Sequence, residues 1–390
     1  MTSKSRGLEP APDAAAQNTP RTSDAFFPSA SERMILDIVR RHRAISRAAI
    51  ASETDLAQQS IHRLVEQLIE RGLLRAGEPV KNGRGQPSPR IELVREAAYT
   101  IGISVNTDSM ALCLADLGCN IVEEILIPTP PTQRDASLAR LNDEVGQLLK
   151  RNKVRRERVI GIGFAMTGFF VGDRRQVNAP EPLQDWSLID LAPILEGCFK
   201  LPVWIENNAT TAAIGESLLG AGLWARNFFY LSFNYGFGGG AVIDGKPYFG
   251  SHGNAGEMTI FTDEEAERRP ALQYLIRELR ANGVEVESVE DLRCRFDPAW
   301  PGVESWIART LPALDRVINS VAGLVDPQAI VFGGQLPPEL GKMLIERARF
   351  WEKHRYGVAP PRPKLVLGEA SGNATVIGAA LVPLKTRFFA

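Results

Sequence analysis

Hydrophobic residues recur at three- and four-residue spacing between Ser29 and Gly72, and this spacing predicts three short helices. The first helix follows a capping box formed by Ser29 and Glu32, and the second follows Ser46 as its cap. The third helix begins near Ala57 and ends at Gly72. Its predicted buried stripe consists of Ile61, Leu64, Val65, Leu68 and Ile69.

Polar residues at the start of the third helix lie outside this buried stripe. They are Gln58, Gln59, Ser60, His62 and Arg63. Three short helices with such an exposed, amide-rich start are typical of a helix-turn-helix, whose recognition helix presents its first turns to the bases of the major groove. Because Gln can pair with adenine and Arg with guanine, Gln58, Gln59 and Arg63 are predicted to read the bases. All five residues are predicted to contact DNA.

Two strand-like runs, 73–79 and 90–94, flank the basic segment Lys81-Asn82-Gly83-Arg84-Gly85-Gln86-Pro87. This pattern predicts a hairpin wing whose tip, with Arg84, contacts phosphates or the minor groove. A three-helix unit with arginines on its surface is also common in proteins that do not bind DNA. The wing beside the third helix favours DNA binding, so residues 29–95 are predicted to form a winged helix-turn-helix domain.

From Tyr99 onward, short apolar runs alternate with amphipathic stretches. Strands are predicted at the apolar runs, which are 100–105, 110–115, 121–127, 159–164, 228–233 and 329–332. Helices are predicted at the longer periodic stretches, which are 136–150, 209–219, 270–282 and 305–324. The order of elements in the first half recurs loosely in the second. The fold class is therefore α/β, with two similarly ordered halves and a cleft between them over residues 98–390.

Glycines and asparagines concentrate between Ile205 and Phe261. The run Gly236-Phe237-Gly238-Gly239-Gly240 predicts a hairpin tip at which the backbone can approach a ligand closely. Asp244-Gly245 predicts a tight turn after the second arm of that hairpin. Asn207, Asn208, Asn254 and Glu257 supply the donors and acceptors that sugar hydroxyls need. The stretch therefore predicts a carbohydrate pocket.

The composition is ordinary, but the charge differs between the two parts of the chain. With 44% hydrophobic and 23% charged residues, the composition is that of a globular protein. Residues 31–95 contain 12 Lys and Arg against 8 Asp and Glu, whereas residues 96–390 contain 30 against 35. A mildly basic module thus precedes an acidic body. Residues 1–28 show no hydrophobic periodicity and are predicted to be a disordered tail.

The four cysteines lack paired spacing, which argues against a disulfide framework and a sequence-local zinc site. No apolar run reaches the length of a membrane helix, and the first 30 residues lack an apolar signal core. A cytoplasmic protein without a membrane partner is expected.

Several of these motifs occur together, in the same order, in one known family. The winged module with its Gly-Arg-Gly-Gln-Pro tip, Ile205-Glu206-Asn207-Asn208-Ala209, the glycine run and His252-Gly253-Asn254-Ala255-Gly256-Glu257 resemble the ROK group of bacterial transcriptional regulators and sugar kinases. The resemblance covers about residues 31–385. It implies a winged helix-turn-helix followed by a two-lobed actin-like ATPase fold, with Asn178, Asn207, Asn208 and Glu257 at a sugar ligand.

Departures from the family pattern separate regulator from kinase. The phosphate loop of the family kinases, Asp-x-Gly-Gly-Thr, is replaced by Ser104-Val105-Asn106-Thr107-Asp108, and Asn208 stands where the kinases have their catalytic Asp. An amide cannot accept a proton from a sugar hydroxyl. The family's cysteine-rich zinc module is also missing after Glu257. We therefore expect no enzymatic activity, no catalytic residue, no cofactor and no bound metal, and a structural role for His252.

The resemblance and its departures lead to one hypothesis and two alternatives. The hypothesis is a DNA-binding repressor of carbohydrate uptake or catabolism genes, acting as a homodimer or homotetramer on operator DNA and controlled by a sugar or sugar-derivative effector. One alternative is an ATP-dependent sugar kinase that carries a DNA-binding domain. The other is a DNA-binding protein whose body serves only for dimerisation. Asn207 and Asn208 would also suit a helix cap at the predicted helix 209–219.

Overall fold

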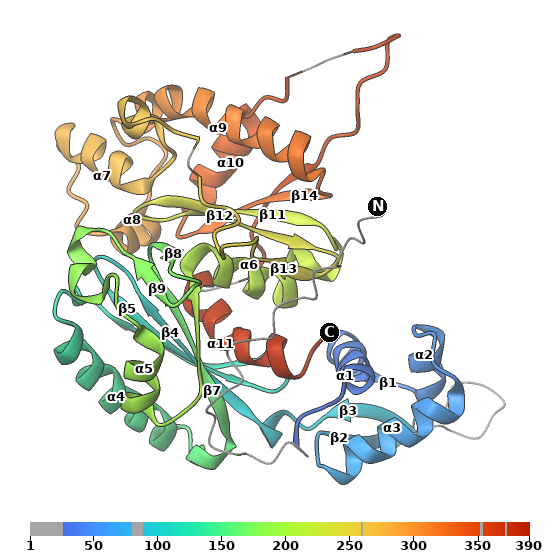
Figure 1. Ribbon diagram of the computed structural model, residues 1–390. Coiled ribbons are helices and arrows are strands. Elements are labelled where there is room, and N and C mark those ends of the chain that lie inside the picture. Colours follow the sequence, from blue (N-terminus) through green and yellow to red (C-terminus); the bar gives the residue numbers. More distant parts are fainter. Residues whose placement is uncertain (1–25, 80–88, 259, 352–353, 371–372) are drawn as a thin grey trace, which may run out of the picture.

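The computed structural model describes residues 26–79, 89–258, 260–351, 354–370 and 373–390 (Figure 1). The N-terminal module contains three helices and a three-stranded sheet of order β1-β3-β2. Its elements are α1 (Ala30–His42), β1 (Ala44–Ile45), α2 (Arg47–Ser52), α3 (Gln58–Glu70), β2 (Leu74–Pro79) and β3 (Pro89–Leu93). Strand β1 was not predicted, because two residues are too few to show a strand pattern.

The helix starts of this module follow the predicted caps. Ser29 and Glu32 form a capping box at α1, and the Ser46 hydroxyl accepts a hydrogen bond from the backbone N–H of Ala49 at α2. The predicted stripe of α3 is buried except for Ile69, which is half-buried. The predicted tip of the wing, including Arg84, lies outside the described residues.

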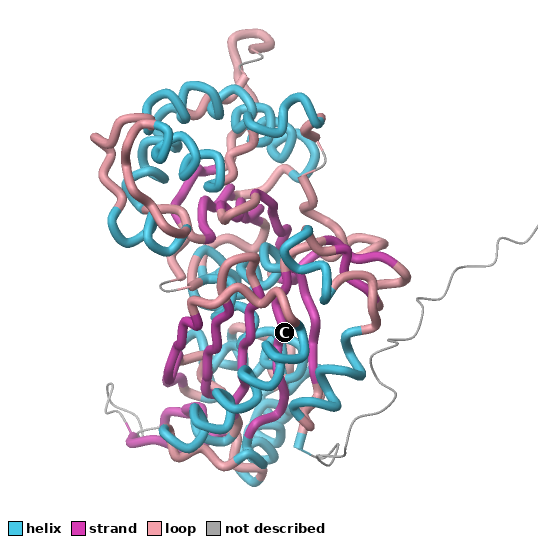
Figure 2. The backbone as a smooth tube through the Cα atoms, turned by 90° about the vertical axis from the view of Figure 1, so that its left-hand side faces the viewer, coloured by secondary structure: helices cyan, strands magenta, loops and turns pink. Residues whose placement is uncertain are grey.

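The body consists of two lobes, each built on a five-stranded sheet (Figures 1 and 2). The elements of the first lobe are β4 (Tyr99–Val105), β5 (Met110–Asp116), β6 (Ile121–Ile127), α4 (Arg134–Arg151), β7 (Val159–Met166), β8 (Phe169–Val171), β9 (Gln176–Asn178), α5 (Leu191–Phe199) and β10 (Val203–Asn207). The elements that follow are α6 (Asn208–Leu219), β11 (Phe228–Phe233), β12 (Phe237–Ile243), β13 (Lys246–Tyr248), α7 (Leu272–Ala281), α8 (Val289–Arg295), α9 (Val303–Val325), β14 (Ala329–Gly334), α10 (Pro338–Arg347), β15 (Lys364–Leu367) and α11 (Ala374–Arg387).

The two sheets have the same topology, which confirms the two similarly ordered halves predicted from the sequence. The first sheet has the order β10-β7-β4-β5-β6, and the second has the order β15-β14-β11-β12-β13 when read in the same direction. In each sheet the first three strands in sequence pair antiparallel, and the other two join parallel on the far side. Each lobe has a hydrophobic core of its own.

Helices α6 and α11 pack against each other between the lobes (Figure 1). Small residues let them come close: a Cβ atom at Gly378 of α11 would collide with the carbonyl oxygen of Thr211 in α6. A Cβ atom at Gly163 of β7 would likewise collide with the backbone of Ala379. All of α6 from Asn208 to Leu218 is buried. The two helices therefore form a tight central layer in which neither can shift without the other.

The glycine run lies mostly within a strand, which corrects the prediction of a glycine-rich hairpin tip. Gly238, Gly239 and Gly240 belong to β12 and pair with β11, and only Gly236 stands in the turn. A side chain at Gly240 would press on Ala213 and the Ala209 carbonyl of α6. Gly240 therefore lets α6 lie directly on the sheet. The predicted Asp244-Gly245 turn is present between β12 and β13, with positive φ at both residues.

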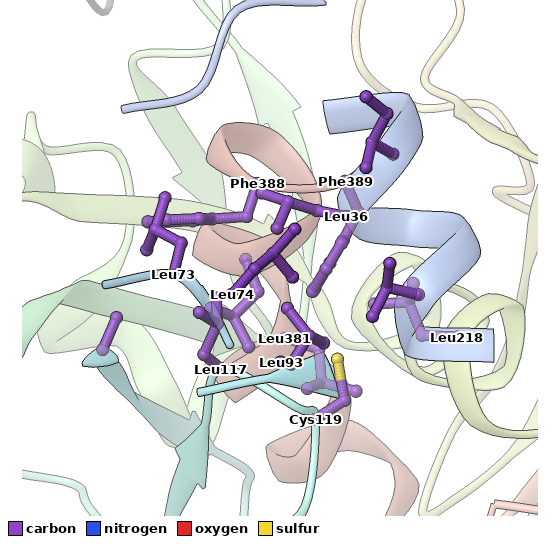
Figure 3. Close-up of a cluster of buried hydrophobic side chains, with 14 of the residues drawn as sticks. Leu36, Leu73, Leu74, Leu93, Leu117, Cys119, Leu218, Leu381, Phe388 and Phe389 are labelled. Atoms are coloured by element: carbon purple, nitrogen blue, oxygen red, sulfur yellow. The ribbon is translucent and has the colours of Figure 1, made fainter. Parts of the chain in front are cut away.

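The N-terminal module shares its hydrophobic core with the body. Figure 3 shows Phe388 and Phe389, which follow α11, lying among leucines of the module such as Leu36 and Leu74. Leu218 at the end of α6 belongs to the same cluster. The module therefore has no core separate from that of the body. The seam, as we call this shared cluster, fixes the module to the body.

The described structure begins inside the segment predicted to be a disordered tail. Phe26 and Phe27 are half-buried, and their rings pack edge-on against Phe388, with centroid distances of 5.9 and 5.7 Å. The prediction of disorder to residue 28 is therefore wrong for these last residues, because their aromatic side chains bury themselves in the seam. Among the described residues, no helix is long and apolar enough to cross a membrane.

Candidate functional site

Asn208 lies at the centre of a polar network between strands of the first lobe. It follows β10 directly and is the first residue of α6, so its side chain meets the ends of β4 and β7. Its Nδ2 donates to Oδ1 of Asn106 and to Oγ1 of Thr167, both at 2.8 Å. Asn208 is buried, and its Oδ1 accepts no hydrogen bond from any described residue. This free acceptor suits a hydroxyl donor on a ligand.

The sequence allowed two roles for Asn207, a helix cap and a ligand contact, and its position in the structure is compatible with both. Its Oδ1 accepts a hydrogen bond from the backbone N–H of Ala209 at 2.7 Å, which caps α6. Its Nδ2 donates to the carbonyl oxygen of Gly168 at 2.6 Å and to Oε1 of Glu257 at 3.2 Å. Three of the four predicted ligand residues, Asn207, Asn208 and Glu257, are therefore linked directly or by adjacency in the chain.

Asn178 stands beside this group at the end of β9. Its backbone pairs with Phe169, and its carbonyl oxygen lies against Gly168, the residue whose own carbonyl accepts from Asn207. Its side chain is half-buried and forms no hydrogen bond with another described residue. The four predicted residues thus lie close together around Gly168, where the first lobe meets the loop after β13, and we call this region the cleft.

Asn254, which the sequence also suggested for a ligand, is already occupied by backbone contacts. Its Oδ1 accepts from the backbone N–H of Phe170 at 2.7 Å, and its Nδ2 donates to the Phe170 carbonyl oxygen at 2.8 Å. The amide thus binds the β8 backbone much as a neighbouring strand would. It fastens the loop that carries Glu257 to the hairpin that carries Asn178.

An ion pair between the half-buried Arg174 and the buried Glu206 was not predicted. Nη2 of Arg174, in the β8–β9 turn, lies 2.6 Å from Oε1 of Glu206, directly before Asn207. The guanidinium also lies over the rings of Phe170 and Phe249, at 4.5 and 5.0 Å from their centroids. Burial raises the pKa of Glu206 to about 7, although Arg174 opposes the shift. Arg174 thereby holds three cleft segments together.

The β4–β5 and β11–β12 turns are held by backbone hydrogen bonds. The backbone N–H of Asn106 donates to the Ser109 carbonyl in the β4–β5 turn, and the Ser109 hydroxyl bonds to Asp108. In the β11–β12 turn, the carbonyls of Asn234 and Tyr235 accept from the first N–H groups of α7. The β4–β5 turn thus presents the Asp108 carboxylate, which repels phosphate oxygens.

The predicted DNA-contacting residues of the third helix lie at the start of α3. Gln58, Gln59, His62 and Arg63 are exposed, whereas Ser60 is half-buried. Arg63 bonds to Gln67 one turn further along the same helix, at 3.3 Å. Contact of these five residues with DNA stays a prediction. Among the described residues, no group of three or more His, Cys, Asp or Glu side chains could hold a metal ion.

Comparison with known sequences identifies relatives over most of the chain. Residues 100–264 match the family model described as ROK family. An uncharacterized protein of Sinorhizobium fredii is 26% identical over 370 residues, covering 93% of this chain and 92% of its own length. The xylose repressor of Bacillus spizizenii is 29% identical over 244 residues, which are 61% of each chain.

Solved structures show the same architecture. A ROK family transcriptional regulator, described as a homologue of the Escherichia coli MLC protein, matches with a TM-score of 0.64 at 22% identity, covering 92% of this chain and 96% of its own. A ROK family glucokinase from Streptomyces griseus matches with a TM-score of 0.59 at 20% identity, covering 73% and 98%. The family thus includes both regulators and sugar kinases. The matched segment identifies residues 100–264 as a ROK family domain, and the two solved structures share the fold of this chain.

Proposed function

We propose that the protein is a transcriptional repressor of carbohydrate uptake or catabolism genes, in which a sugar or sugar derivative bound in the cleft changes the affinity of the module for operator DNA. Residues 29–95 would bind DNA, and residues 98–390 would bind the effector. The observation that carries the proposal is the path of α6. This helix begins in the cleft at Asn208 and ends at the seam, about 18 Å away for 12 residues at 1.5 Å each.

At its far end, α6 is bonded to the first helix of the module. Nη1 of Arg40 in α1 donates to the carbonyl oxygen of Leu218 at 2.7 Å, while its other nitrogens bond to Asp37. The Arg40 side chain is 7% exposed, so this contact is well shielded from water. A second link is formed by Arg33, which donates to the carbonyl oxygens of Lys385 and Phe389. A shift of the central layer would therefore reach the module directly.

The site also supports a regulator over a kinase. Asn208 offers an amide where proton transfer needs a base, and the turn at Asp108 presents a carboxylate in place of free amides. Among relatives, the names include xylose repressor, N-acetylglucosamine repressor and DNA-binding transcriptional dual regulator. The competing function, an ATP-dependent sugar kinase, is the activity of the structurally similar ROK glucokinase. We propose that this chain lacks it.

The proposal implies partners for both ends of the molecule. We expect a homodimer or homotetramer that presents two modules to a two-fold symmetric operator, because helix-turn-helix proteins read half-sites related by the symmetry of the dimer. Gln58, Gln59, Ser60, His62, Arg63 and Arg84 are the proposed DNA contacts. Asn178, Asn207, Asn208 and Glu257 are the proposed effector contacts. Such a regulator would act in the cytoplasm, where its operator lies.

The test measures binding at both ends with the full chain. Operator fragments would be selected from random duplexes, and their affinity titrated with and without each of a panel of monosaccharides, sugar acids and polyols. We expect at least one compound to change operator affinity by about 5- to 150-fold, the range of typical allosteric coupling. ATP with the same compounds should yield no sugar phosphate. Phosphorylation of a sugar, or the absence of any effect of the panel on DNA affinity, would overturn the proposal.

Arg40 provides a sharper variant of this test. Arg40→Met removes the bond to Leu218 but keeps a long apolar side chain. We expect this variant to bind both the effector and the operator. The change in operator affinity caused by the effector should fall to nearly none. Arg41→Met is the matched control, because Arg41 is 42% exposed and lies 3.6 Å from Asp37 without contacting α6. Equal coupling in both variants would show that the path through α6 is wrong.

A further inference from the structure

A crevice lies between the module and the body, away from the cleft. It has a volume of about 540 Å³, within the range of roughly 300–1,000 Å³ typical of small-molecule sites. Its walls are the last turn of α1, the end of β3 with the residues after it, the β5–β6 turn at 118–120, and the end of α6. In Figure 1, α1 and β3 lie on the side of the module that faces the body. Both parts of the molecule therefore line the crevice.

The walls of the crevice are rich in arginine. Five arginines line it, against two glutamates: Arg40, Arg41, Arg43, Arg75, Arg95, Glu92 and Glu96. Arg40 bonds to Asp37 and Arg75 to Glu92. The side chains of Arg43 and Arg95 form no ion pair or hydrogen bond with any residue in the described ranges, and Arg41 approaches Asp37 only at 3.6 Å. The guanidinium groups of Arg43 and Arg95 therefore have no ion-pair partner among the described residues, although Arg95 lies in the field of Asp116, and Arg41 has only its long contact with Asp37.

The floor of the crevice is apolar. Val39, Leu93, Cys119 and Leu218 line it and are all buried. Burial raises the pKa of Cys119 to about 12, so its thiol stays neutral and adds to the apolar floor. A recess with an apolar floor and guanidinium groups at its mouth suits a compact molecule with an apolar face and several negative charges. The planar fork of Arg binds phosphate and carboxylate groups through paired hydrogen bonds.

We propose that this crevice is a second ligand site, which takes a small metabolite with two or more phosphate or carboxylate groups. All five arginines lie within the module, whereas the β5–β6 turn at 118–120 and the end of α6, on the facing walls, belong to the body. A bound anion would therefore hold module and body in one relative position, independently of the cleft. The binding itself does not depend on the proposed regulatory function; only its consequence for DNA affinity does.

The test is calorimetric titration of the full chain with fructose 1,6-bisphosphate, citrate and inorganic phosphate, with fructose as the neutral reference. Fructose 1,6-bisphosphate and citrate separate phosphate from carboxylate recognition, and inorganic phosphate tests whether size matters. We expect one of the two larger anions to bind. The double variant Arg43→Ala/Arg95→Ala should weaken that binding by at least about tenfold, as expected for lost charged hydrogen bonds. Because both arginines are exposed, the variant should fold.

Two control variants test whether the anion binds in the crevice and nowhere else. Arg155→Ala/Arg268→Ala removes the same charge at exposed positions outside the crevice and should leave anion binding unchanged. Asn178→Ala alters the cleft and should also leave it unchanged. Loss of anion binding in either control, or no binding of the two larger anions at about 10 mM, a concentration at which even weak sites of millimolar Kd fill, would overturn the site. The operator affinity of Arg43→Ala/Arg95→Ala without anion is a further check. If this variant bound the operator more weakly and with a smaller salt dependence, the two arginines would contact DNA phosphates, and the proposed site would be overturned.

Discussion

The two ends of α6 differ in how completely their groups are satisfied. At the cleft, Asn208 keeps an unpaired acceptor, and Glu206 is buried with a raised pKa. At the seam, Arg40 is bonded to both Leu218 and Asp37, and the rings of Phe388 and Phe389 are fully buried. The cleft end, which has an acceptor without a partner, suits ligand binding. The seam end, whose groups are paired and packed, suits the transmission of movement. Substitutions at each end of α6, and in the layer between them, should test this contrast. The expected effects are given from the largest to the smallest.

The largest effect is expected at the seam. Phe388→Ala removes a fully buried ring that packs on Phe26 and Phe27, and such truncations cost about 3–5 kcal/mol of unfolding free energy. Chemical denaturation of the full chain would measure the loss. Leu324→Ala is the control, because Leu324 is 87% exposed and its truncation should stay within about 0.5 kcal/mol. Similar values for the two variants would contradict a tightly packed seam.

The layer between the two ends should tolerate no added volume. Gly378→Ala places a methyl group against the Thr211 carbonyl, and we expect a loss of roughly 3 kcal/mol, at the upper end for overpacking. Gly146→Ala in α4 is the matched control: nothing lies near its Cβ position, so better helix propensity should stabilise the protein by up to about 1 kcal/mol. Denaturation curves should therefore move in opposite directions. If both variants were stabilised, α6 and α11 would not be in direct contact.

At the cleft end, stability should depend on pH through Glu206. Its pKa is about 7 in the folded protein against an ordinary value of 4.5, so the folded state binds the proton more tightly. This contribution is fully present below about pH 4.5 and is lost as the pH rises through 7, by roughly 3 kcal/mol at 1.36 kcal/mol per pKa unit. Unfolding free energies at pH 5 and pH 8 should differ less in Glu206→Gln. The same pH dependence in both proteins would show that Glu206 does not titrate in this range.

The smallest effect is expected for two helix caps with the same chemistry. Asn207 caps α6 and Asn373 caps α11, and replacing either by Ala should cost about 1 kcal/mol. Only Asn207→Ala should also weaken effector binding, because only Asn207 contacts Glu257. Thermal stability and effector titration, measured side by side, would separate the two roles. Unchanged effector affinity in Asn207→Ala would leave this residue as a cap alone.

The sequence predicted the positions of helices and strands better than the contacts between residues far apart in the chain. The strand 121–127 and the helix starting after Ser29 follow local patterns, and the structure has both. Strands β8, β9 and β13 have three residues each, too few for an alternating pattern. Contacts between distant residues left no local signal. Nothing in the pattern pairs Arg174 with Glu206, and the separation of Arg40 from Leu218 is larger still.

The contact between residues 33 and 389 also bears on how the protein is made. Arg33 bonds to the carbonyl oxygen of Phe389, 356 positions later in the chain. During synthesis from the N-terminus, the first helix therefore emerges long before its partner exists. Until the C-terminal residues are synthesised, the apolar surface of the module that includes Leu36 and Leu74 stays exposed. Closing such a long loop is slow, so chaperone dependence and mutation-sensitive assembly are expected to concentrate at this surface.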